Sequence, residues 1–151
     1  MGRVFDEMKA FLDGDDWHTS NGSVPNSLVL RVKESNGQWS CVAYAAEDQQ
    51  QFVFYSVAPL KATPDRLAQT AEYLHRANWG LRIGNFELDW SDGEIRFKTS
   101  IDVEDEPLTP QLAKNVVYPN IALMDRYIGG LYQVIQNGAA AKDAIAEAEK
   151  A

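Results

Sequence analysis

The side chains best suited to catalysis or metal binding are two histidines and one cysteine. His18 and His75 lie far apart in the sequence, and neither has a second metal ligand at a usable spacing. A serine or cysteine nucleophile would need one of these histidines as its base. Cys41 falls within a predicted strand, on the face of Leu28 and Leu30, where a buried structural thiol is expected. We therefore predict no catalytic residue, no metal site and no cofactor.

The acidic side chains also have structural explanations. Glu87 and Asp89 are predicted to face cationic residues across a hairpin, and residues 102–106 form an acidic loop. The chain has no glycine-rich phosphate-binding loop. We expect a protein that is not an enzyme, in which His18→Ala, His75→Ala and Cys41→Ser leave the cellular function intact.

Composition narrows the classes of partner. A chain of 151 residues supports a single domain, and its net charge is −8. That charge argues against nucleic acid and against an anionic membrane surface, because both require clusters of lysine and arginine. No apolar run is long enough to span a membrane, and the start of the chain does not resemble a signal peptide. We expect a cytoplasmic location.

The stretch around Asp92-Gly93 predicts a β-hairpin, because both residues tolerate the positive φ of a type I′ turn. A two-residue loop there gives one apolar face and one face of matched charge. The apolar pairs are Trp90 with Ile95, Leu88 with Phe97, and Phe86 with Thr99. The charged pairs are Asp89 with Arg96 and Glu87 with Lys98.

Asn36-Gly37 predicts a second hairpin by the same reasoning. Its inner pairs would be Val32 with Cys41, Leu30 with Ala43, and Leu28 with Ala45. Residues 52–58 follow and are apolar on both faces. Such a strand is either central in the sheet or covered by a partner on one face.

Three helices complete the pattern. Residues 4–12 have apolar side chains at helical spacing, and Thr63-Pro64 and Thr109-Pro110 are typical helix starts. The third helix carries two apolar stripes, of which one sheet face can cover only one. Pro119 should kink or split it, and Gly129-Gly130 indicates a kink or a close backbone contact.

This order predicts an α+β fold, α-β-β-β-α-β-β-α, with one five-stranded antiparallel sheet and helices packed on it. Residues 1–137 would form a single domain. Residues 138–151 are rich in Ala, Glu and Lys, with Ile145 as their only large apolar residue, so they would form an exposed tail.

Several segments together resemble the YbjN-type family, which is described as bacterial sensory transduction regulators. The segments are Asn85-Phe86-Glu87-Leu88-Asp89, Asp92-Gly93-Glu94-Ile95-Arg96-Phe97, Leu108-Thr109 and Asp125-Arg126-Tyr127. The element order matches from Val4 to about Asn137, most specifically from Trp79 to Leu131. The resemblance implies a fold like that of type III secretion chaperones. It supplies no catalytic residues, and Gly129-Gly130 stands where relatives often carry proline.

Two functions follow from these observations. The first is a non-enzymatic protein-binding module with a chaperone-like or regulatory role in signalling or stress, bound to a protein of unknown identity or to a second copy as a homodimer. The alternative is a small-ligand sensor with a pocket between sheet and helices. The predicted partner surface consists of the second sheet face and the second apolar stripe of the third helix. The sheet face belongs to it only if no helix covers that face. The residues of this predicted surface are Val29, Val42, Tyr44, Val53, Tyr55, Ile121, Met124 and Ile128.

Overall fold

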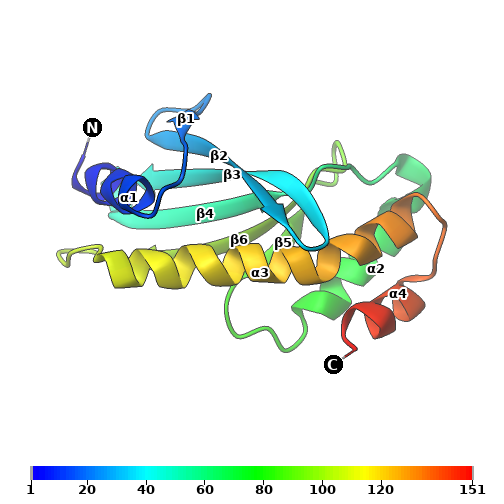
Figure 1. The fold of residues 1–151 in the computed structure, drawn as a ribbon. Coiled ribbons are helices and arrows are strands. Elements are labelled where there is room, and N and C mark those ends of the chain that lie inside the picture. The colour runs from blue at the N-terminus through cyan, green and yellow to red at the C-terminus, as the bar shows by residue number, and fades with distance from the viewer. Residues whose placement is uncertain (1, 151) are drawn as a thin grey trace.

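The computed structural model describes residues 2–150, which form helices packed against one face of an antiparallel sheet (Figure 1). The α-helices are α1 (Arg3–Gly14), α2 (Leu67–Asn78), α3 (Pro110–Ile135) and α4 (Ala141–Ala148). Two short 3-10 helices are η1 (Glu47–Gln49) and η2 (Pro64–Arg66). The strands are β1 (Ser20–Asn21), β2 (Ser27–Glu34), β3 (Gly37–Ala46), β4 (Gln51–Val57), β5 (Asn85–Leu88) and β6 (Ile95–Asp102).

The sheet has six strands in the order β1-β2-β3-β4-β6-β5. The α+β class and the single antiparallel sheet are as predicted, but the prediction of five strands is wrong. The additional strand, β1, is only two residues long and pairs with Val29 and Leu28 of β2. Its sequence is polar and has no alternation, so hydrophobic periodicity could not reveal it.

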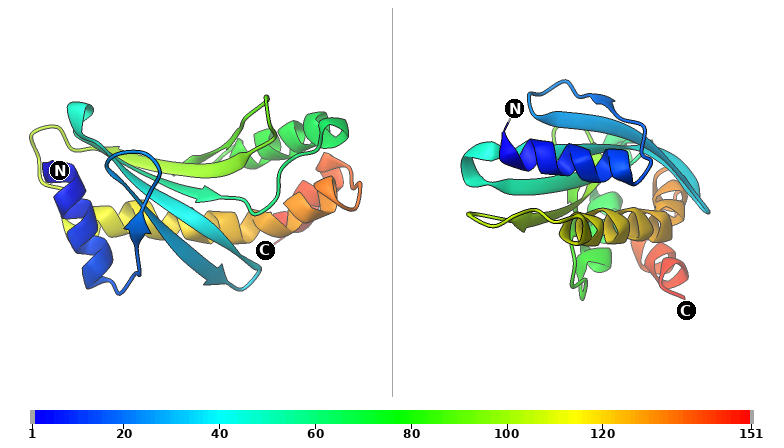
Figure 2. Two further views of the ribbon diagram at one scale, coloured as in Figure 1. Left: turned by 90° about the horizontal axis from the view of Figure 1, so that it is seen from above. Right: turned by 60° about the vertical axis from the view of Figure 1, so that its left-hand side comes forward.

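One face of the sheet is buried beneath the helices. Inward side chains of β2, β3, β4 and β6 alternate with outward ones, as the pleat requires. Helices α1 and α3 both pack on this inner face, and α2 packs against β5. Figure 2 (left) looks onto the opposite face, where no helix crosses in front of the central strands.

Both predicted hairpins exist, but each pairing is shifted by two residues. Around Asp92-Gly93 the last pair is Leu88 with Ile95, and Phe86 lies opposite Phe97. The loop is longer than the predicted two residues. The Asp89 backbone N–H donates to the Glu94 carbonyl (2.8 Å), and the Asp89 carbonyl accepts from the Gly93 N–H (2.8 Å). Gly93 takes a φ of 81°, which favours glycine.

The other hairpin turns one residue earlier than predicted, at Ser35-Asn36, so that Leu30 lies opposite Cys41. The Asn36 backbone N–H donates to the Asp125 carboxylate of α3 at 2.8 Å. A Cβ at Gly37 would lie 3.0 Å from Ile128. The glycine therefore allows close packing against α3 instead of forming the turn.

Helix α3 is continuous over 26 residues, so Pro119 does not split it. The buried Asn120 side chain fixes its position on the sheet, because its Nδ2 donates to the carbonyls of Phe54 (2.9 Å) and Phe97 (3.0 Å). Gly130 makes the close contact predicted for the glycine pair, since a Cβ there would meet the Tyr73 hydroxyl. That hydroxyl donates to the Tyr127 carbonyl at 2.7 Å.

The prediction of an exposed tail after residue 137 is wrong. Residues Ala141–Ala148 form α4, which packs on α2 and α3 and buries Ala141, Ala144 and Ile145. Polar side chains outside the tail hold it in place. Arg66 donates to the Ala139 carbonyl (2.7 Å), and the Gln69 side chain accepts from the Ala141 N–H (2.9 Å).

Over residues 2–150, none of the helices combines the length and the apolar character that crossing a membrane requires.

Candidate interaction surface

The open face of the sheet carries an unusual number of apolar side chains. We define the open sheet face by the large apolar residues that point outward from β2, β3 and β4, all of which are only partly buried: Val29, Val42, Tyr44, Val53, Tyr55 and Val57. Register places Val29, Val42 and Tyr55 side by side, with Tyr44 beside Val53 in the next row. The apolar side chains therefore form one continuous patch across three strands.

Cationic side chains border this patch. Arg31 and Lys33 lie on β2 at one margin, and Arg96 and Lys98 lie on β6 at the other. The Arg96 guanidinium stacks over the Tyr55 ring, 4.2 Å from its centroid, and this arrangement fixes the ring orientation. In a chain with a net charge of −8, this face therefore combines apolar surface with local positive charge.

Glu87 of β5 holds the two cations of β6 in place. Its carboxylate accepts from Arg96 Nε (2.6 Å) and from Lys98 Nζ (2.9 Å). Burial of the carboxyl opposes its ionisation, but these two hydrogen bonds outweigh that effect and lower the pKa of Glu87. An ion pair between Glu87 and Lys98 is present, but the predicted pairing is wrong, because Arg96 and not Lys98 lies directly opposite Glu87. Arg96 pairs with Glu87 instead of with Asp89, its predicted partner.

The face is also hollowed. A groove of about 510 Å³ runs across β3 and β4 between the loop at Val24–Asn26 and the start of β6. Tyr44, Tyr55 and Val57 form its floor, and Glu94 and Arg96 form one wall. Val24 is 52% exposed on the other wall. An aromatic and aliphatic floor between one charged wall and one partly apolar wall is typical of a surface that receives a protein segment.

The helical half of the predicted partner surface is not exposed. Ile121, Met124 and Ile128 are all buried within one chain, with Met124 and Ile128 at 0% exposure. The second stripe of α3 needs no partner because α1, the β2–β3 hairpin and the sheet cover it together. Only the sheet half of that surface remains available for binding.

The residues considered for catalysis do not come together as a site. His18 and His75 are exposed, and Cys41 is fully buried, with Ser56 Oγ 3.4 Å from its sulfur. Burial raises the pKa of Cys41 to about 12, although hydrogen bonds from Ser56 and Trp39 act in the opposite direction. Within residues 2–150, no group of three or more His, Cys, Asp or Glu side chains is arranged to hold a metal ion.

Sequence reasoning missed two parts of the surface. Val57 belongs to the apolar patch, and its place between Ser40 and Arg96 depends on the register of three strands. The groove wall at Val24 depends on a loop, which has no periodicity. The alternation of Arg31 and Lys33 with buried Leu30 and Val32 was a readable signal for the cationic margin.

The fold and this surface define a small α+β protein with an open apolar sheet face. A model of the YbjN family, described as "Putative bacterial sensory transduction regulator", matches residues 5–131. The chain therefore belongs to the YbjN family, as the sequence resemblance indicated. The sequence matches no curated protein.

A solved structure among those that match shares the fold. It is described as "Crystal structure of YbjN, a putative transcription regulator from E. coli". The two chains are 14% identical and superpose with a TM-score of 0.66, over 86% of this chain and 93% of the other. At that identity the likeness shows the fold alone, and the likeness to secretion chaperones stays a prediction.

Proposed function

We propose that this protein is a non-enzymatic regulatory module that binds a polypeptide partner through the open sheet face. The partly exposed apolar patch on β2, β3 and β4 is the observation that carries the proposal. A contiguous apolar surface of this kind in a protein with its own complete core usually marks an interface. Membership in a family of regulators supports a role in control.

Charge and geometry support the proposal. Tyrosine and arginine are among the residues that most often dominate binding energy at interfaces, and Tyr55 of the patch stacks with Arg96 at its margin. The Cys41 thiol is fully buried and its pKa is raised to about 12, so it is unsuited to act as a nucleophile, which fits the proposed non-enzymatic role.

The alternative is a small-ligand sensor with a pocket between sheet and helices. The space between those layers is filled by side chains, among them Phe52, Phe54 and Phe97, each at 0% exposure. A ligand would therefore have to displace core side chains, which is costly in a close-packed interior. The open sheet face supports the binding-module proposal more directly.

A homodimer remains a prediction, and the open sheet face is the part of its predicted interface that is still exposed. Light scattering after size exclusion at micromolar concentration measures the mass. If the wild type is a dimer and Val53→Glu dissociates it, the partner is a second copy of this chain.

Affinity capture from a native lysate tests the proposal. The bait is the full chain, and the variant is Val53→Glu, which places a charge within the patch, beside Tyr44. The matched control is Gln133→Glu, on the exposed side of α3. We expect a protein that the wild type and the control retain and the sheet variant loses. Equal retention by all three would contradict the proposal, and a thermal shift with small metabolites would then favour the sensor.

A further inference from the structure

The outer edge of the sheet is left without a strand beside the second half of β2. Strand β1 pairs only with Val29 and Leu28 and then ends. The chain before β1 diverges from β2, so that β2 runs on alone towards the hairpin tip (Figure 2, left). An unpaired edge of this kind is a template for another strand.

The hydrogen bonds show which backbone groups are offered at this edge. The Asn26 carbonyl accepts from Ala45 of β3 (3.0 Å), whereas the Ser27 carbonyl accepts from Gly22 on the outer side (2.9 Å). Because these directions alternate along an antiparallel strand, the N–H and C=O groups of Val29, Arg31 and Lys33 also point outward. Val29 is opposite Ser20 of β1. Within residues 2–150, Arg31 and Lys33 have no strand to receive these groups.

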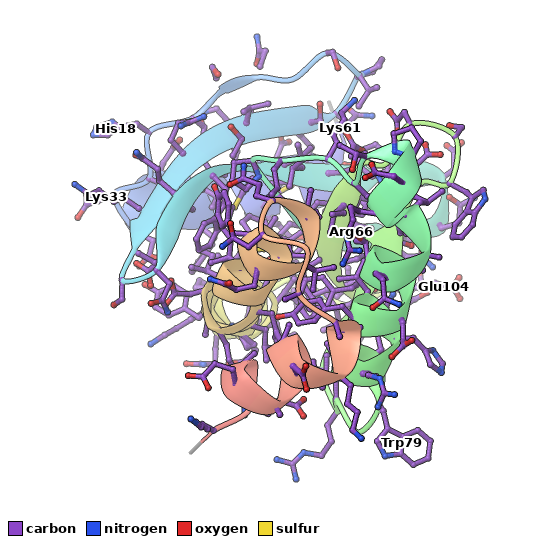
Figure 3. All side chains as sticks on the ribbon, turned by 90° about the vertical axis from the view of Figure 1, so that its right-hand side faces the viewer. His18, Lys33, Lys61, Arg66, Trp79 and Glu104 are labelled. Atoms are coloured by element: carbon purple, nitrogen blue, oxygen red, sulfur yellow. The ribbon has the colours of Figure 1, made fainter. Side chains whose placement is uncertain are left out.

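The side chains at this edge favour a partner segment with acidic residues. Arg31 and Lys33 are both exposed, and Figure 3 shows Lys33 projecting outward at the same margin as His18. Within residues 2–150, the Arg31 side chain donates a hydrogen bond only to the neutral Ser40 hydroxyl, at 2.9 Å. A residue paired with either cation would place its own side chain on the same face, where an acidic group gains a cross-strand ion pair. Pairing between two copies of this edge would instead oppose like charges.

A groove lies on the other side of the same edge. It measures about 630 Å³ and is lined by Trp17, Glu34 and the α3 residues Tyr118, Pro119 and Ala122. The Asp15 carboxylate fixes both aromatic side chains, since it accepts from Trp17 Nε1 (3.0 Å) and from the Tyr118 hydroxyl (2.7 Å). A side chain opposite Val32 points to the helix side of the sheet, because Val32 itself is buried there.

We propose that this edge binds an extended segment of a partner protein by strand addition, and that the segment has the pattern acidic, apolar, acidic. The two acidic residues lie opposite Arg31 and Lys33, and the apolar residue between them enters the groove beside Trp17 and Tyr118. Main-chain hydrogen bonds to Arg31 and Lys33 provide affinity, and the alternating side chains provide specificity. The inference rests on the proposed function, because the added strand extends the open sheet face.

Fluorescence anisotropy with a capped, labelled nonapeptide of alternating glutamate and valine tests this site on the full chain. We expect saturable binding that weakens in high salt. The double variant Arg31→Glu with Lys33→Glu should lose affinity at least tenfold. The control Arg82→Glu with Lys142→Glu has the same net charge and reverses exposed cations elsewhere, so it should bind like the wild type.

Backbone methylation separates strand addition from simple charge attraction. We take the added strand to be antiparallel to β2, like every other pair in the sheet, so that a glutamate opposite Arg31 donates its N–H to β2, whereas the neighbouring valines donate away from it. A peptide N-methylated on its glutamates should therefore fail to bind, and one methylated on its valines should bind. Equal binding of the two methylated peptides, equal binding of an alternating lysine and valine peptide, or no binding of any peptide would overturn the inference.

The proposed function is tested separately by Val53→Glu. This variant lies on β4, so it should bind the peptide normally while it loses the captured partner. Loss of peptide binding alone would remove the edge site and leave the open sheet face as an interface. Peptide binding together with partner capture that Val53→Glu leaves unchanged would do the reverse.

Discussion

At the scale of single residues, polar side chains in this protein mainly fix the structure. Asn120 joins α3 to two strands, Asn78 binds the edge strand at Phe86, and Asp15 holds two aromatic rings. None of these roles has a sequence motif, because each depends on residues brought together from distant parts of the chain. The sequence did identify Cys41 as a buried thiol, since it alternates with outward residues in a strand.

Cys41 should not react with a thiol reagent in the native protein. Its pKa is raised to about 12 by burial, so the reactive thiolate is scarce at neutral pH. We expect negligible labelling by a disulfide reagent in native buffer and complete labelling in denaturant. Rapid labelling of the native protein would show that the strand opens or that the thiol is accessible.

Glu87 should make stability depend on pH. Its pKa is lower in the folded chain than its ordinary value of 4.5. The stabilisation is therefore fully present above that value and is lost as the pH falls through the folded-state pKa. Glu87→Gln should lower the free energy of unfolding at neutral pH by about 0.5–1 kcal/mol, a range suited to a partly exposed pair. Denaturant unfolding should show no difference in strongly acidic buffer, and the exposed control Glu104→Gln should show none at either pH.

At the scale of elements, the order of helices and strands was readable from the sequence, but strand register was not. Phe86, Leu88, Ile95 and Phe97 share a face in both the predicted and the observed hairpin, because a shift of two residues preserves the alternation. The loop hydrogen bonds that set the true register involve Asp89, Gly93 and Glu94. Helix α4 was not predicted, because its few apolar residues stabilise it only by packing against α2 and α3, and that packing depends on the tertiary fold.

The two glycines of α3 give a matched test of helix packing. Gly130→Ala should destabilise the protein by about 1–3 kcal/mol, because the new methyl group collides with Tyr73 and disturbs its hydrogen bond to Tyr127. Gly129→Ala meets nothing within 4 Å and should stabilise the helix by about 1 kcal/mol. Thermal unfolding measures both, and the same sign for the two variants would contradict this packing.

Helix α4 should contribute measurably to stability. Ile145 is 8% exposed, and Ile145→Ala should cost about 2 kcal/mol. For a chain of this size, the melting temperature should fall by about 4–8 °C. Lys142→Ala, on the exposed side of the same helix, is the control and should change it by less than about 1 °C. A silent Ile145→Ala variant would show that the helix does not dock in solution.

At the scale of the whole molecule, one layer of helices protects one face of the sheet and leaves the other uncovered. Alternation of apolar and polar residues predicted the inner face, and the apolar residues at Val42, Tyr44, Val53 and Tyr55 correctly indicated that the outer face is apolar. Whether a helix covers that face depends on the topology of the chain, which local patterns do not specify. The same limitation made the second stripe of α3 look exposed when it is buried.

Photo-crosslinking in living cells is the most direct test of the open sheet face as an interface. A photoreactive phenylalanine analogue is placed at Val53, within the patch, and in a second strain at Gln133, which is exposed on α3. We predict a discrete, light-dependent adduct from Val53 whose mass identifies the partner, and none from Gln133. No adduct from Val53, or the same adducts from both positions, would contradict the claim that this face binds a polypeptide.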